Sequence, residues 1–219
     1  SRVRGARGRA AIAGAAGTVT NAGSISGTGK YAVRFGAGFA NRMIIVPGAT
    51  FIGKVNGANK SGSSVVSTLD LAVGATDGTF SGFGTQFTNF GSMVVDAGAT
   101  WSLATAAVLT VYGTVVNVGT ITDTVTLGAS GTLANAPLAR ITVATSSAII
   151  STAANVSIIN AGGIGVGTGS VPVAAISLTM GGQVTNLRSL ETISAYSGIV
   201  IQGNTGTIIN DGEIRGFGV

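Results

Sequence analysis

A seven-residue motif recurs along this chain and restricts its fold more than any other feature. The motif has the order apolar–x–Asn–x–Gly–x–apolar, as in VVNVGTI at residues 115–121 and IINDGEI at residues 208–214. Neighbouring copies lie 24, 26, 28, 43 or 68 residues apart. This spacing fits a structural unit of about 20–28 residues, with some gaps spanning two or more units. The asparagines of the copies are Asn21, Asn89, Asn117, Asn160, Asn186 and Asn210, and the copy at Asn186 has arginine in place of glycine.

A second motif occupies the gaps between these copies. It reads apolar–x–x–Gly–Ala–Thr/Ser and occurs at residues 45–50, 71–76, 95–100 and 125–130, with glycines 26, 24 and 30 residues apart. Because two independent motifs share one period, the chain is predicted to have a repeat architecture. The hydroxyl residues that end the motif are expected to form one ladder along the repeats: Thr50, Thr76, Thr100 and Ser130.

Each copy reads as a short strand, a turn and a second short strand. Alternating Val, Thr and Ile give the period-2 pattern of a half-buried strand, and Asn and Gly accept the positive φ of tight turns. One unit buries too little apolar area to offset the ordering of its backbone, so neighbouring units must stack. The sequence therefore predicts an all-β fold, a single-stranded right-handed parallel β-helix of about nine or ten coils. Residues 1–219 form one domain in this prediction, and the six asparagines form a ladder of side-chain amides along its axis.

The composition agrees with this fold and disfavours others. Glycine contributes 36 of the 219 residues, charged residues only 9%, and the mean hydropathy is +0.55. So much glycine destabilises helices, the hydropathy excludes a disordered chain, and the glycines do not recur every third residue as in collagen. No apolar run of the sequence reaches the roughly 18 residues of a membrane-spanning helix.

Histidine and cysteine are both absent. Disulfides, thiol nucleophiles, Ser-His-Asp triads and His-ligated zinc are therefore excluded within this chain. A Gly-rich stretch at residues 162–169 lacks the Lys-Ser/Thr ending of a phosphate-binding loop. The sequence predicts neither a cofactor nor a metal site.

Carboxylates are the remaining candidates for catalysis. A polysaccharide lyase or hydrolase on a β-helix needs clustered aspartates with a basic residue, and paired carboxylates are the usual machinery of glycoside hydrolysis. Asp70, Asp77, Asp96 and Asp123 do not fall in one column of the repeat. Asp70 and Asp96 have the same parity and are expected to be diagonal neighbours, with no Lys or Arg aligned with them. We therefore expect a protein that is not an enzyme, with a carbohydrate-active enzyme as the alternative.

Charge is distributed unevenly along the chain. Residues 1–69 contain nine basic residues and no acidic one, whereas residues 70–219 contain three basic and seven acidic residues. Because the chain runs from one end of the rod to the other only once, one end is positive and the other weakly negative. The basic end is expected to contact a polyanion or surface glycan, or the acidic end of a second copy. The candidate contacts are Arg2, Arg4, Arg7 and Arg9 of the basic N-terminal segment 1–16, together with Lys30 and Arg34.

Aromatic residues bear on two further partner classes. Nucleic-acid binding is disfavoured, because no aromatic residue is interleaved with the N-terminal arginines before Tyr31 to provide a stacking platform. Trp101, Phe51 and Phe80 are expected to cap the core at a corner of the coil, with stacking against sugar rings as the alternative. A second group is expected to form an internal aromatic stack and not a binding groove: Phe80, Phe83, Phe87 and Phe90.

Four segments resemble the passenger repeats of bacterial autotransporter and filamentous-haemagglutinin-like surface proteins. They are VTNAGSISGTG, FGAGFANRMIIVPGATF, FTNFGSMVVDAGATW and IINDGEIRGFG. The resemblance runs from about Gly17 to the end of the chain and is weaker across residues 137–156. It implies a secreted, right-handed β-helical stalk on the bacterial cell surface that adheres to surfaces or presents other domains.

These observations together predict a non-enzymatic structural and adhesive segment of a secreted bacterial surface protein. A rigid rod would hold an interaction surface away from the cell. End coils expose unpaired backbone groups that are templates for strand addition, so homo-assembly by end-to-end stacking is also expected. The last residues begin a repeat without completing it, and a fragment of a longer protein is expected.

Overall fold

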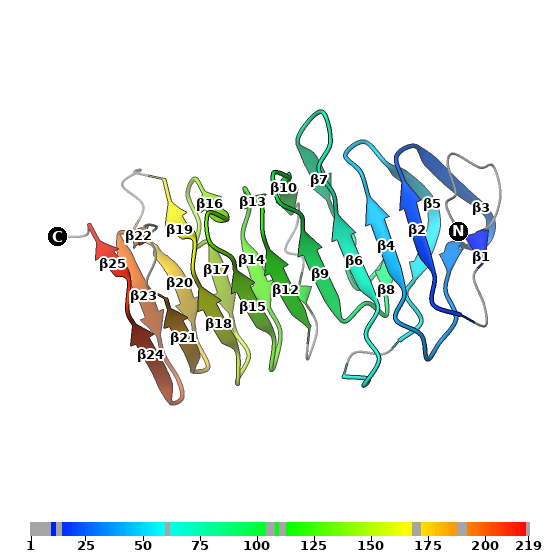
Figure 1. Ribbon diagram of the computed structural model, residues 1–219. Helices are drawn as coiled ribbons and strands as arrows, with labels where there is room; N and C mark the ends of the chain where they lie inside the picture. The colour runs from blue at the N-terminus through cyan, green and yellow to red at the C-terminus, as the bar shows by residue number, and fades with distance from the viewer. Residues whose placement is uncertain are drawn as a thin grey trace.

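The computed structural model describes residues 10–11, 15–59, 62–103, 108–109, 113–167, 172–187 and 192–217. In these residues it is a right-handed parallel β-helix with 25 strands and no helix (Figure 1). Every strand pairing runs parallel, and the strands form four sheets. The predicted fold class is therefore confirmed.

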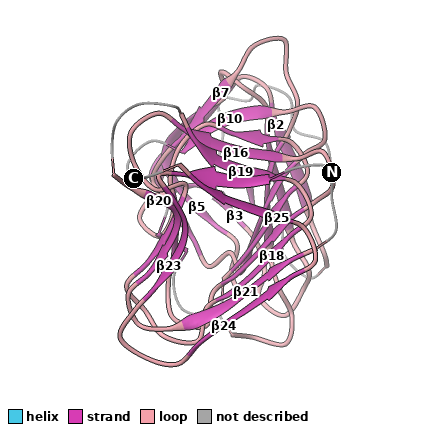
Figure 2. Ribbon diagram, turned by 90° about the vertical axis from the view of Figure 1, so that its left-hand side faces the viewer, coloured by secondary structure: helices cyan, strands magenta, loops and turns pink. Residues whose placement is uncertain are grey.

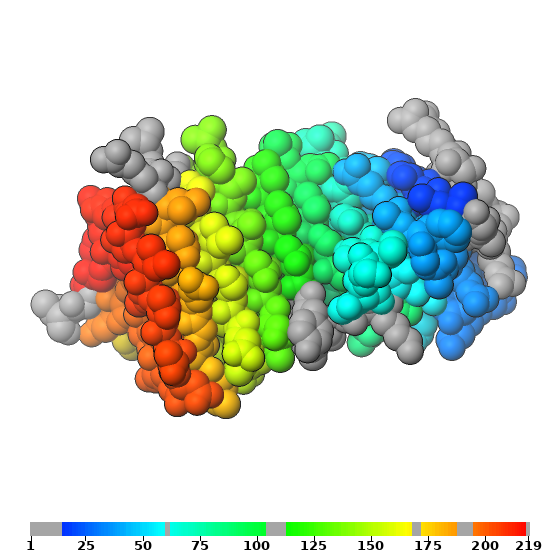
Figure 3. Space-filling model, turned by 60° about the horizontal axis from the view of Figure 1, so that its bottom comes forward, coloured from blue at the N-terminus to red at the C-terminus, as the bar shows by residue number. Residues whose placement is uncertain are grey.

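The longest sheet has nine strands and takes one strand from each coil. Its strands, in spatial order, are β2 (Thr18–Asn21), β4 (Arg42–Ile45), β6 (Thr68–Leu71), β9 (Ser92–Val95), β12 (Thr114–Asn117), β15 (Thr132–Asn135), β18 (Ser157–Asn160), β21 (Gly182–Asn186) and β24 (Gly206–Asn210). This order equals the sequence order, so each coil lies directly on the one before it. Figure 3 shows the result on the outer surface as successive bands of colour along the rod.

Three further sheets complete the coils. The seven-stranded sheet contains β7 (Gly78–Phe80), β10 (Thr100–Leu103), β13 (Thr120–Ile121), β16 (Arg140–Val143), β19 (Gly163–Val166), β22 (Thr192–Ala195) and β25 (Glu213–Gly216). The five-stranded sheet contains β11 (Val108–Leu109), β14 (Val125–Leu127), β17 (Ile149–Ser151), β20 (Ala174–Leu178) and β23 (Ser197–Ile201). The four-stranded sheet contains β1 (Ala10–Ala11), β3 (Ser24–Arg34), β5 (Thr50–Asn56) and β8 (Phe87–Thr88). Figure 2, which looks along the rod, shows the sheets around a common interior.

About seven turns of the solenoid contribute a strand to both long sheets, and nine contribute a strand to the longest one, so the coil count differs only slightly from the nine or ten predicted. The coils are uneven in length, because neighbouring asparagines in one column are separated by as few as 18 and as many as 26 residues. Loops also take up residues that the prediction assigned to coils. The segment 57–67 between β5 and β6 is such a loop in its described residues.

Strand alternation places one apolar residue of each coil in a continuous inner column. Strands β9, β12 and β15 each alternate half-buried and buried residues. One residue in each of eight consecutive strands of the nine-stranded sheet is fully buried and lies in register with its neighbours. It is the second residue of the first seven strands and the third of β21: Val19, Met43, Leu69, Met93, Val115, Leu133, Ile158 and Val184. Stacking of coils thus closes the core that a single coil leaves open.

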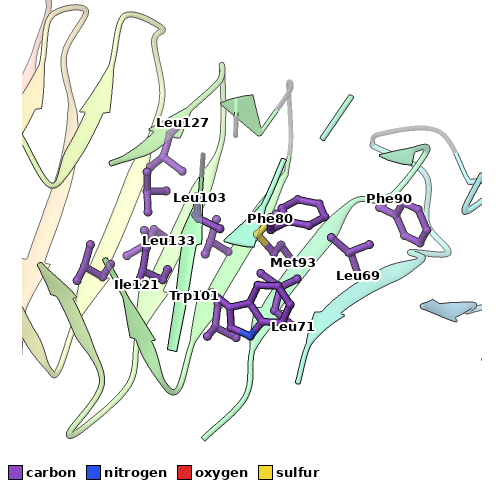
Figure 4. Close-up of a cluster of buried hydrophobic side chains, with 14 of the residues drawn as sticks. Leu69, Leu71, Phe80, Phe90, Met93, Trp101, Leu103, Ile121, Leu127 and Leu133 are labelled. Atoms are coloured by element: carbon purple, nitrogen blue, oxygen red, sulfur yellow. The ribbon is translucent and has the colours of Figure 1, made fainter. Parts of the chain in front are cut away.

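Aromatic side chains lie among the aliphatic ones in this core (Figure 4). Trp101 is buried, and its indole N–H donates to the carbonyl of Ala72 at 3.0 Å. Its ring packs on Gly78, where a Cβ atom would lie 2.4 Å from a ring carbon. The rings of Phe80 and Phe87 lie 5.0 Å apart, centroid to centroid. The predicted burial is confirmed for Trp101, Phe80, Phe87 and Phe90, whereas Phe51 and Phe83 are only partly buried and pack against this core.

The predicted hydroxyl ladder is wrong, because its four residues do not stack in one column. Thr50 pairs with Ser24, and Thr100 pairs with Thr120. Thr76 lies in the loop between β6 and β7, and Ser130 lies in the turn that precedes β15. The copy of the motif at residues 125–130 therefore occupies another corner than the copies at residues 45–50 and 95–100.

The corner after the nine-stranded sheet uses a type II turn in three coils. The backbone N–H groups of Ala49, Ala99 and Ala139 each donate to the carbonyl three residues earlier, at 3.0–3.1 Å. The third turn residue has a positive φ, which is 82° at Gly48, 74° at Gly98 and 68° at Leu138. Glycine is favoured at this position of a type II turn because it has no Cβ atom. The same positive φ is therefore strained at Leu138.

We expect Leu138→Gly to raise the free energy of unfolding by about 1 kcal/mol, because it relieves this strain at a side chain that is 80% exposed. Val73→Gly is the matched control, since Val73 is also exposed and is not among the residues of positive φ. That change should lower the free energy of unfolding, because glycine gives the unfolded chain more backbone entropy. Urea unfolding of both variants measures the difference. Equal shifts in the same direction would contradict the strain at Leu138.

Candidate functional site

An unbroken ladder of side-chain amides runs through the C-terminal half of the solenoid. The Nδ2 atom of each asparagine donates to the Oδ1 atom of the asparagine in the next coil, always at 2.8 Å. The ladder consists of Asn117, Asn135, Asn160, Asn186 and Asn210, each the last residue of its strand in the nine-stranded sheet.

The ladder also holds the adjoining corner of the coils. The second amide proton of Asn117 goes to the carbonyl of Arg140 at 3.0 Å, and that of Asn135 goes to the carbonyl of Gly163 at 3.2 Å. Asn186 donates in the same way to the carbonyl of Glu213 at 3.3 Å. These amides therefore join two sheets as well as neighbouring coils. Satisfying buried polar groups in this way stabilises one register over its alternatives.

Two of the six predicted ladder residues lie outside this ladder. Asn21 occupies the same column, but Ile45, Leu71 and Val95 separate it from Asn117. Its amide binds its own corner, donating to the carbonyl of Thr50 at 3.0 Å and accepting from the N–H of Gly23 at 3.1 Å.

Asn89 lies in no column of the nine-stranded sheet, so its assignment to the ladder is wrong. It has a φ of 59°, and its Nδ2 donates to Oδ1 of Asn56 at 2.9 Å. The ladder residue that the motif missed is Asn135. The turn after it has the sequence Ala-Pro-Leu-Ala and so matches neither the Asn-x-Gly pattern nor the Gly-Ala-Thr pattern.

A second buried polar network lies near the N-terminal end, and sequence reasoning did not identify it. Oδ1 of Asn41 accepts from the N–H of Gly17 at 3.1 Å, and its Nδ2 donates to the carbonyl of Gly57 at 3.1 Å. Nδ2 of Asn59 donates to the hydroxyl of Ser67 at 2.9 Å. All three side chains are buried. The network fastens the loops on either side of β4 and β5 to the solenoid.

The ladder makes a prediction about stability. Asn160→Ala should lower the free energy of unfolding by about 2–4 kcal/mol, because it leaves buried polar atoms of Asn135 and Asn186 without partners. Asn210→Ala removes the exposed last residue of the ladder and should cost less than about 1 kcal/mol. Urea unfolding measures both. Equal losses would show that burial of the ladder is not what makes it stabilising.

The most unusual ionisable group is Asp70, which lies on the outer face of the nine-stranded sheet. It pairs there with Ile44 of β4 and Val94 of β9, yet its side chain is fully buried. Nε of Arg42 donates to its Oδ2 at 2.6 Å, and its Oδ1 has no hydrogen-bond partner. Burial raises the pKa of Asp70, the hydrogen bond from Arg42 lowers it, and the nearby carboxylate of Asp96 raises it again.

Arg42, Asp70 and Asp96 thus bring together two carboxylates and a cation. The expectation that no basic residue accompanies Asp70 and Asp96 is wrong, because Arg42 reaches Asp70 diagonally from the neighbouring coil. The other two aspartates lie apart from this group. Asp77 is exposed in the loop before β7, and Asp123 accepts from the N–H of Thr124 at 2.8 Å.

The group of Arg42, Asp70 and Asp96 has the residue types of a carboxylate active site, but a substrate cannot reach Asp70. A substrate must touch the acid that acts on it, and Asp70 is covered. Two surface hollows of the described residues lie elsewhere. One of about 540 Å³ is lined by Asn155, Ser157, Gln183, Asn204 and other uncharged residues. One of about 260 Å³ is lined by Phe51, Thr79, Phe80, Gln86 and other uncharged residues.

The raised pKa of Asp70 predicts a pH dependence of stability. The folded protein binds this proton more tightly than the unfolded chain, so stability should fall as pH rises from about 4 through the folded-state pKa. Asp70→Asn should remove this contribution to the slope of the free energy of unfolding against pH, measured from pH 4 to pH 8. Asp96→Asn should reduce it, since one cause of the shift is gone.

Asp77→Asn is the control for this experiment, because Asp77 is exposed and should leave the slope unchanged. An Asp70→Asn variant with the same pH dependence as the wild type would contradict the assigned cause.

The predicted polyanion contacts divide into two sets. Arg2, Arg4, Arg7 and Arg9 lie outside the described residues. Lys30 and Arg34 lie on β3, where both flank the ring of Tyr31. The described residues contain no group of three or more His, Cys, Asp or Glu placed to hold a metal ion. They also contain no helix with the length and apolar character needed to span a membrane.

Comparison with known proteins finds no matching family model, no matching curated protein and no matching solved structure.

Proposed function

We propose that this chain is a non-enzymatic, rigid segment of a secreted bacterial surface protein that displays an interaction surface for adhesion. The observation that carries the proposal is the continuous nine-stranded sheet with its inner column and amide ladder. Such a sheet transmits rigidity from coil to coil without a separate hinge, which suits a spacer or stalk. The resemblance to passenger repeats supports a place at the bacterial cell surface or outside the cell.

The same proposal includes end-to-end assembly through the end coils. In the coil of β24, Ile208 and Ile209 are 49% and 44% exposed, whereas Val184 in the previous coil is fully buried. The segments GTVTNAGSI at residues 17–25 and GTIINDGEI at residues 206–214 share the Asn-x-Gly turn. The segment at residues 17–25 of one copy can therefore pair with the segment at residues 206–214 of another copy and continue the sheet.

The alternative is a carbohydrate-active enzyme, and one observation favours it. Arg42, Asp70 and Asp96 form the combination of charges that such an enzyme needs. Against it, Asp70 is fully buried, and the two hollows described above are lined by other residues. Structural burial of an ion pair is the better account of this group, and the display function is preferred.

Adhesion without turnover is the expected result. Beads coated with the purified chain should adhere to polysaccharide-coated surfaces, while the polysaccharide gains no new reducing ends or unsaturated products. Beads coated with an unrelated protein of similar pI are the control for non-specific charge. Release of new ends by the wild type, abolished in Asp70→Asn and Asp96→Asn, would replace the proposal with the enzyme.

Sedimentation velocity of the same preparation at rising concentration tests the assembly part of the proposal. End stacking predicts larger species that form as concentration increases. A single monomeric species at every concentration would remove assembly from the proposal and leave display intact.

A further inference from the structure

A compact basic cluster lies on the outer face of the four-stranded sheet. We call Lys30, Tyr31 and Arg34 of β3 and Lys54 of β5 the Tyr31 cluster. Nζ of Lys30 lies 5.4 Å from the centroid of the Tyr31 ring, and Cζ of Arg34 lies 5.7 Å from it. Lys54 is the direct neighbour of Tyr31 across the two strands. All three cations are exposed and the tyrosine is half-buried.

A local irregularity of β3 builds this cluster. The pairing of β3 with β5 shifts register between Ser26 and Tyr31 and again between Tyr31 and Val33. Bulges of this kind redirect side chains at the places where they occur.

Two glycines allow the close approach of the backbone at this irregularity. A Cβ atom at Gly27 would lie 2.0 Å from the carbonyl oxygen of Tyr31. Gly53 has a φ of 110°, and a Cβ atom there would lie 2.9 Å from the backbone nitrogen of Ala32. The backbone positions from which the cations project are therefore fixed by paired strands and do not lie in loops.

The charge of the cluster is not neutralised by the protein. Residues 1–69 contain no aspartate or glutamate. In the described part of the chain, no carboxylate forms an ion pair with Lys30, Arg34 or Lys54, and Asp70 is already engaged by Arg42. Exposed charges of one sign on a rigid surface attract a polyanion.

The surface around the cluster favours a sugar polymer over a nucleic acid. The Tyr31 ring already has two cations close to it, so it offers little face for stacking a base. Ile52, two residues before Lys54 on β5, is 62% exposed and offers an apolar contact for the C–H face of a sugar ring. The distribution of exposed cations over both β3 and β5 suits a linear chain better than a small ligand.

We propose that the Tyr31 cluster binds an anionic polysaccharide, whose sulfate or carboxylate groups accept hydrogen bonds from Lys30, Arg34 and Lys54. This inference rests on the proposed display function, because it assigns the surface that the rod presents. It adds Lys54 and Tyr31 to Lys30 and Arg34, the two described contacts predicted from sequence.

Calorimetric titration with dextran sulfate tests the inference, with neutral dextran as the matched probe. The wild type should bind dextran sulfate, weakly or not at all at high salt, and should not bind neutral dextran. The double variant Lys30→Gln/Lys54→Gln should bind about tenfold more weakly, since two exposed ion pairs are lost. Lys54→Glu alone should weaken binding further than Lys54→Gln.

The control variant Arg140→Gln/Arg215→Gln removes the same charge from the seven-stranded sheet. It should change the affinity less than about twofold. Equal weakening in the two double variants would overturn the inference, because binding would then follow net charge alone. Tighter binding of oligo(dT) than of dextran sulfate would also overturn it, in favour of a nucleic-acid partner.

The failure of this inference can be told apart from the failure of the proposed function. If dextran sulfate does not bind but coated beads still adhere, the displayed surface lies elsewhere and the Tyr31 cluster is not the site. If dextran sulfate binds as expected but the chain cleaves polysaccharide, the cluster stands as a binding surface and the non-enzymatic display function fails. Unfolding curves of all variants confirm that each remains folded.

Discussion

Parallel hydrogen bonding between successive coils is the interaction on which the rest of this structure depends. A coil of about two dozen residues has no core of its own, and its strands are too short to be stable alone. Once stacked, each coil supplies partners for the backbone groups of its neighbours and covers one edge of their apolar interior. The column from Val19 to Val184 is buried only because another coil lies on each side of its inner members. Ile208, at the same position in the last described coil, remains half exposed.

The amide ladder adds selectivity to this stacking. A one-residue slip between coils would turn every inward side chain outward, and would also separate each Nδ2 from the Oδ1 that it reaches at 2.8 Å. The N-terminal coils lack this device, since Ile45, Leu71 and Val95 occupy the column there. In that half, aromatic packing around Trp101 and the polar network of Asn41 and Ser67 provide the specific contacts. Two chemically different solutions therefore fix the register in the two halves of one rod.

Outward-facing positions are free to vary, and function is expected among them. The Tyr31 cluster shows how a local bulge places cations on an otherwise regular surface. The ion pair of Asp70 and Arg42 is the contrasting case, in which an outward position becomes covered and its charge is neutralised within the protein. Access, more than residue type, distinguishes a binding surface from a structural charge pair.

The fold could be predicted from sequence because its period appears in two motifs at once. The ladder could be predicted only in part, since the Asn-x-Gly motif identifies a turn and not a position in the coil. Asn89 has the motif but lies in another turn, whereas Asn135 has the position but is followed by a type II turn. The partnership of Asp70 with Arg42 was missed because it is diagonal across coils of unequal length. Register between coils, which depends on loop lengths, is the information that the local pattern lacks.

A distance measured across several coils tests this account most directly. The chain has no cysteine, so spin labels can be placed at Ser92→Cys and Gln183→Cys alone. These outward positions are joined in register through Thr114, Thr132 and Ser157, that is, by four successive strand steps. Pulsed electron-paramagnetic-resonance measurements should give one narrow distribution near 19 Å, or roughly four times the strand spacing. A broad distribution, or one centred far from this distance, would contradict the stacked solenoid.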